Sequence, residues 1–318
     1  MTTVTAIAER DIEFTSGTLT LTGTFTTPAE TGPAPALLLL PGSGQTDRDD
    51  NAKKLALNVF PQLAHAIGEF GIATLRYDKR GVGASQGDYW RTGFDDRLTD
   101  AAAALRWLRG QPDVVDLYRI FVLGHSEGAL IAVRLAAQDA AVAGAILLGG
   151  SAKTGEETLL WQGDQVAHTL TGFNKWLVDH LHIDPRKQQR KYIERIKASS
   201  ADTIRAQGIQ KVNAKWFREF LAYDPEPDLA AVRVPVLAIT GEKEIQVDPA
   251  DLARMAELVP GDFESHLVPD LTHLLRAEAG EPGLKTYKQQ VRRPVDDRVI
   301  QYVLTWLKEK TRGHHQQA

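Results

Sequence analysis

The sequence predicts an α/β fold in which an antiparallel hairpin precedes a mostly parallel sheet and a helical segment interrupts it. Short apolar runs that stop at glycine or proline alternate with longer amphipathic stretches, which is the pattern of strands and helices around a parallel sheet. The chain has 318 residues, of which 43% are hydrophobic and 25% charged. This balance is typical of a folded protein with a large core.

The hairpin is expected first, at residues 11–27, where threonine alternates with leucine, phenylalanine or glycine around Ser16 and Gly17. The strands of the parallel sheet are expected in the apolar runs 36–42, 72–78, 119–124, 142–150, 234–240 and 263–269. The helices are expected in a stretch ending near residue 70 and at 95–110, 127–138, 249–259 and 294–310.

Residues 151–227 break this alternation, because they contain charged helical stretches and no strand pattern. They predict a helical cap inserted into an α/β core formed by residues 1–150 and 228–318. The large aromatic residues of this insertion either line an apolar acyl site or form the core of the cap itself. They are Trp161, Phe173, Trp176, Trp216 and Phe217.

Charge and residue content exclude several classes of protein. The net charge is −4 and no long basic run is present, so no nucleic-acid partner is expected. The chain has no cysteine, which excludes disulfides and thiolate chemistry. No apolar run approaches the roughly 18 residues of a membrane span, and no signal peptide is recognisable, so a cytoplasmic protein is expected. No phosphate loop or metal motif is present, which predicts a protein without a cofactor or metal.

The segment GHSEG, residues 124–128, matches the GxSxG pattern of a serine nucleophile. RIFVL before it has the pattern of a buried strand and GALIAVRLAAQ after it that of a helix, which is the context in which this motif exposes a serine hydroxyl. A serine needs an imidazole to take its proton and a carboxylate to orient that imidazole. The motif predicts Ser126 as the nucleophile of a serine hydrolase.

His273 is the expected general base, because it follows the last predicted strand, in the C-terminal loop where the order serine, acid, histidine places the base. His125 and His266 are expected to have packing or scaffold roles. His180 and His182 have metal-like spacing, but their charged surroundings favour solvated surface. The acid is expected in the loop 241–249, where spacing alone leaves three carboxylates open, namely Glu242, Glu244 and Asp248.

Five stretches, spread over most of the chain outside the insertion, carry a family resemblance. They are LPGSGQTDRD (40–49), LRYDKRGVGAS (75–85), LGHSEGALIA (123–132), GEKEIQV (241–247) and THLL (272–275). Together they resemble a bacterial family of α/β-hydrolase esterases and serine-aminopeptidase-like hydrolases. The resemblance implies the α/β-hydrolase fold and hydrolysis of a small carboxylic ester. A peptidase or amidase of the same fold and a non-catalytic receptor are the alternatives, and the oligomeric state is left open.

The resemblance also implies which residues complete the site. The acid of the family is usually the aspartate of a GxxDxQV pattern, and Glu244 stands at that position here, with Asp248 as the nearest substitute. The oxyanion hole of this fold takes one backbone N–H from the residue after the nucleophile, here Glu127, and another from the loop after strand 36–42, where Ser43 is the first choice and Gly44 the second.

Charged residues flank two of the matching stretches. We expect them to form ion pairs beneath the site rather than to bind a charged end of the substrate. They are Asp47, Arg48, Asp49, Arg76, Asp78 and Arg80.

Overall fold

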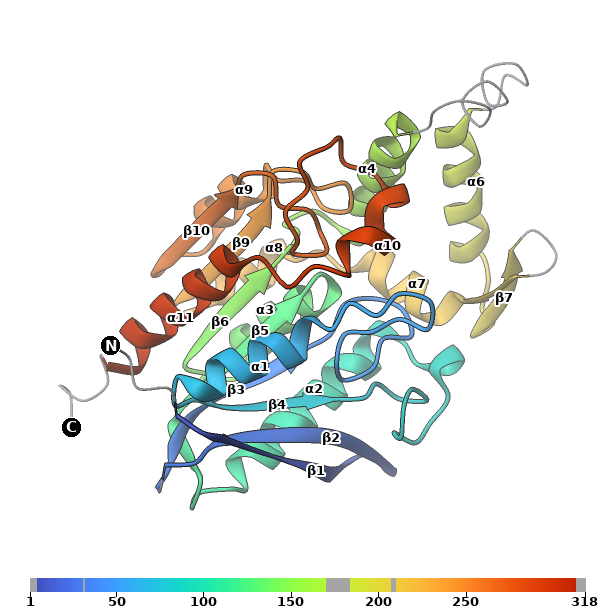
Figure 1. Cartoon of the computed structure of the whole chain (residues 1–318). Helices are drawn as coiled ribbons and strands as arrows, with labels where there is room; N and C mark the ends of the chain where they lie inside the picture. The colour runs from blue at the N-terminus through green and yellow to red at the C-terminus, as the bar shows by residue number, and fades with distance from the viewer. Residues whose placement is uncertain (1–4, 31, 170–183, 207–209, 313–318) are drawn as a thin grey trace.

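An eight-stranded sheet runs through the protein, with helices on both of its faces (Figure 1). The computed structural model describes residues 5–30, 32–169, 184–206 and 210–312. The order of the strands is β1-β2-β4-β3-β5-β6-β9-β10. They are β1 (Ile7–Ser16), β2 (Leu19–Pro28), β3 (Ala34–Leu40), β4 (Ala73–Tyr77), β5 (Val115–His125), β6 (Gly144–Leu148), β9 (Val236–Gly241) and β10 (Phe263–Val268).

The sheet is antiparallel at its N-terminal edge and parallel elsewhere. β1 pairs with β2, and β2 with β4, in antiparallel register, while all pairs from β4 to β10 are parallel. The tight turn between β1 and β2 contains Gly17 at a φ of 61°, a conformation that glycine adopts without steric cost. The predicted hairpin and mostly parallel sheet are confirmed.

The two faces of the sheet have separate cores, because successive side chains of a strand point in opposite directions. Leu37 and Leu39 of β3 belong to the core that α1 and α11 cover, whereas Leu38 and Leu40 belong to the core that α2, α3 and α9 cover. All four are fully buried or nearly so, which explains why this strand is a continuous apolar run. The helices are α1 (Val59–Glu69), α2 (Phe94–Arg109), α3 (Glu127–Gln138), α8 (Glu226–Ala231), α9 (Asp251–Leu258), α10 (Tyr287–Gln290) and α11 (Asp297–Arg312).

The insertion lies at one end of the sheet and differs from the sequence expectation in one respect (Figure 1). It contains the expected helices but also a small antiparallel pair of strands, β7 and β8. These strands have only four residues each, TIRA and QKVN, and carry no apolar alternation by which the sequence would reveal them. The elements are α4 (Gly155–His168), α6 (Pro185–Lys197), β7 (Thr203–Ala206), β8 (Gln210–Asn213) and α7 (Ala214–Ala222).

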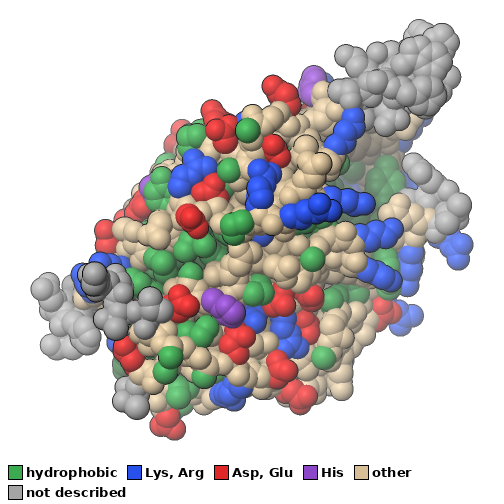
Figure 2. Space-filling model, in the orientation of Figure 1, with side chains coloured by type: hydrophobic (Ala, Val, Ile, Leu, Met, Phe, Trp, Pro, Cys, Tyr) green, Lys and Arg blue, Asp and Glu red, His purple; other side chains and the backbone are tan. Residues whose placement is uncertain are grey.

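Acidic and basic side chains are interspersed over the face of the core that Figure 2 shows. Among the helices that the structure describes, none combines the length and the apolar character needed to cross a membrane.

Candidate active site

Ser126 lies in a sharp turn between β5 and α3. Its φ of 55° is rare for a residue other than glycine, so the surrounding structure must impose it. A side chain at Gly124 would collide with the backbone of Gly128, and one at Gly128 would collide with the carbonyl of Leu40. The two glycines of the motif therefore let strand and helix approach closely enough to form this turn.

His273 and Glu244 meet behind this turn. The Nδ1 atom of His273 lies 2.8 Å from Oε1 of Glu244, and both side chains are almost completely buried. His273 and Ser126 line the same cavity. Asp248 makes a different contact, because its Oδ2 accepts a hydrogen bond of 2.9 Å from the Lys153 ammonium. The structure thus brings Glu244, and not Asp248, to the imidazole.

The loop after β3 lies against Ser126, since a side chain at Gly42 would lie about 3.5 Å from the Cβ of Ser126. Ser43 lines both cavities that border Ser126, whereas Gly44 lines neither. Two buried charged side chains hold this loop: Lys79 donates hydrogen bonds to the carbonyls of Gly42 and Gly44, and Asp50 accepts one from the N–H of Gly42 at 2.8 Å. The backbone on both sides of Ser43 is therefore anchored.

The family model described as serine aminopeptidase, S33, matches residues 56–280, which is more than half of the chain. The chain belongs to this family. It carries the serine, histidine and carboxylate described above on a framework that solved relatives share.

Three relatives illustrate the likeness. Esterase EstD from Thermotoga maritima is 26% identical over 290 residues, which are 90% of this chain but only 65% of the length of EstD. Polyketide transferase grgF from a Penicillium species is 33% identical over 147 residues, 45% of this chain and 46% of the transferase. The structure of Est1E from Butyrivibrio proteoclasticus with ferulic acid superposes with a TM-score of 0.63 at 17% identity, covering 94% of this chain and 99% of Est1E. The predicted α/β-hydrolase fold is confirmed.

The residue after Ser126 belongs to a buried charge cluster. Glu127 forms ion pairs with Arg97 and, at 3.6 Å, with Lys79. Burial opposes the charge of Glu127, but Arg97 and Lys79 outweigh it and lower its pKa. Burial, together with the neighbouring Arg97, lowers the pKa of Lys79 to about 8. Neither Lys79 nor Arg97 was expected from the sequence to have a role, although Lys79 lies within the matching stretch 75–85.

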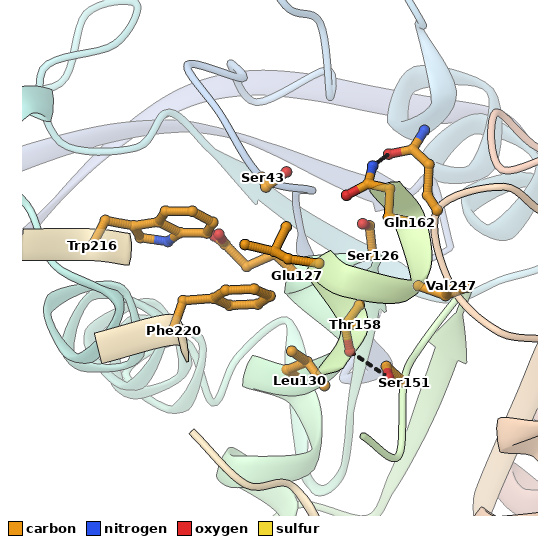
Figure 3. A pocket seen from close by; sticks show the side chains of 12 residues that line it. Ser43, Ser126, Glu127, Leu130, Ser151, Thr158, Gln162, Trp216, Phe220 and Val247 are labelled. Atoms are coloured by element: carbon orange, nitrogen blue, oxygen red, sulfur yellow. Dashed lines mark hydrogen bonds between the residues drawn. The ribbon is translucent and has the colours of Figure 1, made fainter. Parts of the chain in front are cut away.

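Two cavities meet at Ser126. The first, of about 70 Å³, extends toward the insertion and is walled by α3, α4 and α7 (Figure 3). The second, of about 130 Å³, contains His273 and is walled by the loop after β3 and by Tyr287. Ser43, Ser126 and Gln246 line both.

The aromatic residues of the insertion divide between two roles. Trp216 lines the first cavity, stacked on Phe220 with ring centroids 4.8 Å apart, while Phe217 packs against Tyr192 within the insertion. Trp161 lines neither cavity. Phe220 also lines the first cavity, one helical turn after Trp216, and was not among the residues expected from the sequence. Four residues named earlier lie outside the described part of the chain: Phe173, Trp176, His180 and His182.

His266 and His125 lie where scaffold residues are expected. His266 stacks on Tyr302 and contacts Glu264 at 2.6 Å, and it lines neither cavity. His125 is buried and hydrogen-bonded to Asp50. Within the described residues, no cluster of three histidine or carboxylate side chains is arranged to hold a metal ion.

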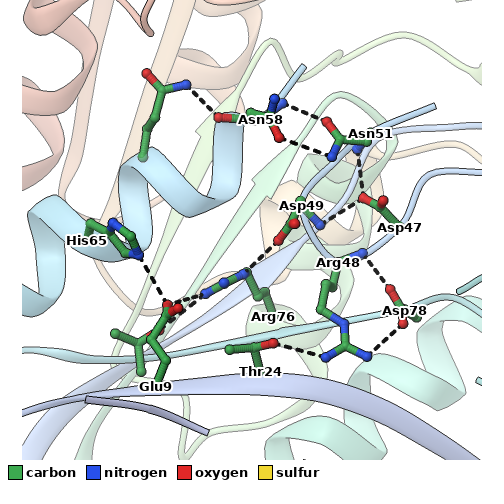
Figure 4. Close-up of polar contacts among 12 residues, drawn as sticks. Glu9, Thr24, Asp47, Arg48, Asp49, Asn51, Asn58, His65, Arg76 and Asp78 are labelled. Atoms are coloured by element: carbon green, nitrogen blue, oxygen red, sulfur yellow. Dashed lines mark hydrogen bonds and ion pairs between the residues drawn. The ribbon is translucent and has the colours of Figure 1, made fainter. Parts of the chain in front are cut away.

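The charged residues near the site pair with one another (Figure 4). Arg48 contacts Asp78 at 2.8 Å, and Arg76 contacts Asp49 at 2.9 Å and Glu9 at 3.0 Å. These pairs join the loop after β3 to β1 and β4, so the guanidinium groups hold the framework. Two further expected residues are also engaged, Asp47 by the backbone N–H groups of Asp49 and Asn51, and Arg80 by Asp96 and Asp100.

Proposed function

We propose that this protein is a carboxylesterase that hydrolyses small, uncharged esters through an acyl-enzyme on Ser126. The observation that carries the proposal is the contact of 2.8 Å between His273 and Glu244, together with the cavity that His273 and Ser126 both line. The sequence likeness to an esterase supports it. A cytoplasmic location and the lack of a nucleic-acid partner stay predictions from the sequence.

In the proposed reaction, Ser126 attacks the ester carbonyl and passes its proton to His273. Because Nδ1 of His273 faces Glu244, Nε2 is the nitrogen that takes this proton, and the carboxylate stabilises the imidazolium. The backbone N–H groups of Ser43 and Glu127 bind the negative charge that develops on the carbonyl oxygen. His273 then protonates the departing alkoxide, and a water molecule activated by His273 hydrolyses the acyl-enzyme.

The two cavities are suited to different parts of the ester substrate. The leaving oxygen must lie within hydrogen-bonding reach of the imidazole that protonates it, so the alcohol part belongs in the second cavity, which His273 lines. The acyl part then occupies the first cavity, against Leu130, Trp216 and Phe220. Ligand sites for drug-sized molecules measure roughly 300–1,000 Å³, so a cavity of about 70 Å³ favours a short acyl chain.

An aminopeptidase is the second candidate, because the family description names that activity. Such an enzyme has to balance the positive charge of an α-ammonium group. The described carboxylates that line the two cavities are already paired, Glu127 with Arg97 and Lys79, and Asp50 with His125. This pairing favours an uncharged ester.

We assign residues 1–150 and 228–318 to the catalytic core and residues 151–227 to a cap. Thr158 and Leu159 of α4, with Trp216 and Phe220 of α7, form the outer wall of the first cavity, which supports this division.

The test compares wild type with Ser126→Ala on p-nitrophenyl acetate and butyrate, on aminoacyl p-nitroanilides, and in fluorophosphonate labelling followed by intact mass. We expect ester hydrolysis and a single adduct in wild type, and a loss of turnover on the order of 10⁶ in the variant, because the triad acts as a unit. Faster hydrolysis of anilides would favour the aminopeptidase. A folded wild type without activity or adduct would favour a non-catalytic receptor.

A further inference from the structure

A second histidine–carboxylate pair, Asp50 and His125, is buried in the wall of the second cavity, beside His273. The Nδ1 atom of His125 is 2.6 Å from Oδ2 of Asp50, and its Nε2 atom is 2.9 Å from the backbone carbonyl of His273. Oδ1 of Asp50 accepts the hydrogen bond of 2.8 Å from the N–H of Gly42. One imidazole and one carboxylate therefore join the loop after β3, the turn at Ser126 and the loop after β10.

The partners of His125 determine its protonation. A carbonyl oxygen only accepts, so Nε2 carries a proton, and a second proton on Nδ1 lets the imidazole donate to Asp50 as well. Burial opposes a charged imidazole, but Asp50 and the carbonyl of His273 outweigh it and raise the pKa of His125. An imidazole with both nitrogens engaged as donors cannot accept the proton of Ser126. His125 thus has no general-base role in this arrangement.

The sheet alone does not set the position of His273 relative to Ser126. β6 and β9 lie between β5, which ends at the nucleophile, and β10, which precedes the base. The loop after β10 must extend back across both strands. The hydrogen bond from His125 attaches this loop next to Ser126, and a bond from Arg276 to the carbonyl of Leu57 attaches it at a second point.

We infer that Asp50 and His125 are positioning residues. They fix the position of the Ser43 loop relative to the His273 loop, so that the oxyanion donor and the general base act on the same ester carbonyl. This inference rests on the proposed esterase function. Asp50 and His125 act through the backbone of Gly42 and His273, and their own polar atoms are occupied by these contacts. Loosening the pair lowers turnover because catalytic groups displaced by about 1 Å lose on the order of 10² in rate.

Three substitutions distinguish the contact of His125 with Asp50 from its contact with the His273 carbonyl. His125→Asn places an amide near Nδ1, so it keeps a partner for Asp50 and loses the bond to His273. His125→Gln places an amide near Nε2 and does the reverse. Asp50→Asn keeps the shape and suits the backbone, since Asp50 has a φ of 63° that asparagine tolerates, but it removes the charge. His266→Asn is the matched control, because it removes the Nε2 group and so breaks a histidine–carboxylate contact of the same 2.6 Å outside the cavities.

The readouts are kcat and KM on p-nitrophenyl butyrate, with melting temperature. We expect kcat to fall about 10²-fold in His125→Asn, while KM stays within about threefold of the wild-type value. The substitution disturbs the relative position of the catalytic groups and leaves ester binding intact. Asp50→Asn should keep kcat within about tenfold of wild type, and His266→Asn should match wild type. A folded His125→Asn with wild-type kcat, or one whose loss is confined to KM, would overturn the inference.

Nuclear magnetic resonance of the protein labelled with ¹⁵N-histidine tests the pair independently of catalytic activity. Both ring nitrogens of one buried histidine, assigned to His125 by their absence from His125→Gln or Asp50→Asn spectra, should be protonated at pH 7.5. A singly protonated ring would contradict the inference. A wild type that shows this signature but neither hydrolyses esters nor takes a fluorophosphonate would instead defeat the proposed function.

Discussion

Substitution of Glu244 tests the proposed acid most sharply, because its contact with His273 is short and sealed from solvent. The carboxylate lies 2.8 Å from Nδ1, and the two side chains are 1% and 4% exposed. In Glu244→Gln the amide has no charge to stabilise the imidazolium and can favour the wrong tautomer. Loss of this role costs on the order of 10⁴ in kcat in serine hydrolases, which corresponds to about 5 kcal/mol of transition-state stabilisation.

Glu244→Asp tests the reach of the side chain. Removing one methylene withdraws the carboxylate by about 1.5 Å, which opens the contact to about 4.3 Å and breaks the hydrogen bond unless the loop moves. We therefore expect Glu244→Asp to lose most of the activity, although aspartate is the usual residue of the family at this position. Asp248→Asn is the control, since Asp248 contacts Lys153 instead.

The assay is kcat and KM on p-nitrophenyl butyrate, with melting temperatures to verify folding. The expected order of kcat is wild type and Asp248→Asn highest, Glu244→Asp lower, and Glu244→Gln lowest. A greater loss in Asp248→Asn than in Glu244→Gln, with both variants folded, would refute the assignment of the acid. Full activity of Glu244→Asp would show that the loop adapts and that the distance argument is wrong.

Two further predictions concern Lys79 and Leu159. Burial lowers the pKa of Lys79 to about 8, so between pH 8 and 10.5 the unfolded chain binds more protons than the folded protein, and the free energy of unfolding should rise with pH by up to about 3 kcal/mol. Urea unfolding at several pH values should show this rise in wild type relative to Lys79→Met, and parallel profiles would contradict it. Leu159→Ala widens the first cavity on the side of α4, so the ratio of kcat/KM for hexanoate over butyrate esters should increase. The expected increase is about fourfold for each methylene that the space accepts, at about 0.8 kcal/mol each. An unchanged ratio would place the acyl chain elsewhere.

Local pattern was enough for most elements of the core. The helix expected at 127–138 spans Glu127–Gln138, and the strand expected at 36–42 is β3, Ala34–Leu40. Apolar periodicity and glycine punctuation are local properties, so they are visible in the sequence. The strands β7 and β8 were missed because four polar-rich residues carry no period, and their pairing depends on contacts made elsewhere in the insertion.

The candidate site also combines features that the local sequence reveals with contacts that depend on the fold. The sequence could predict Ser126 as the nucleophile because its motif, strand and helix are contiguous, and His273 as the base because its loop follows the last strand. The spacing of Glu244 and Asp248 left both open as partners of the imidazole until the fold brought one to 2.8 Å and paired the other with Lys153.

The sequence by itself determined the class of fold, the predicted nucleophile and the predicted base, since each depends on residues within one short segment. Only the tertiary structure decided which carboxylate meets His273, that Lys79 and Arg97 converge on Glu127, and that Asp50 and His125 join three loops. These contacts join residues up to 148 positions apart in the chain. Strand order and loop packing create such proximity, and a linear pattern does not record it.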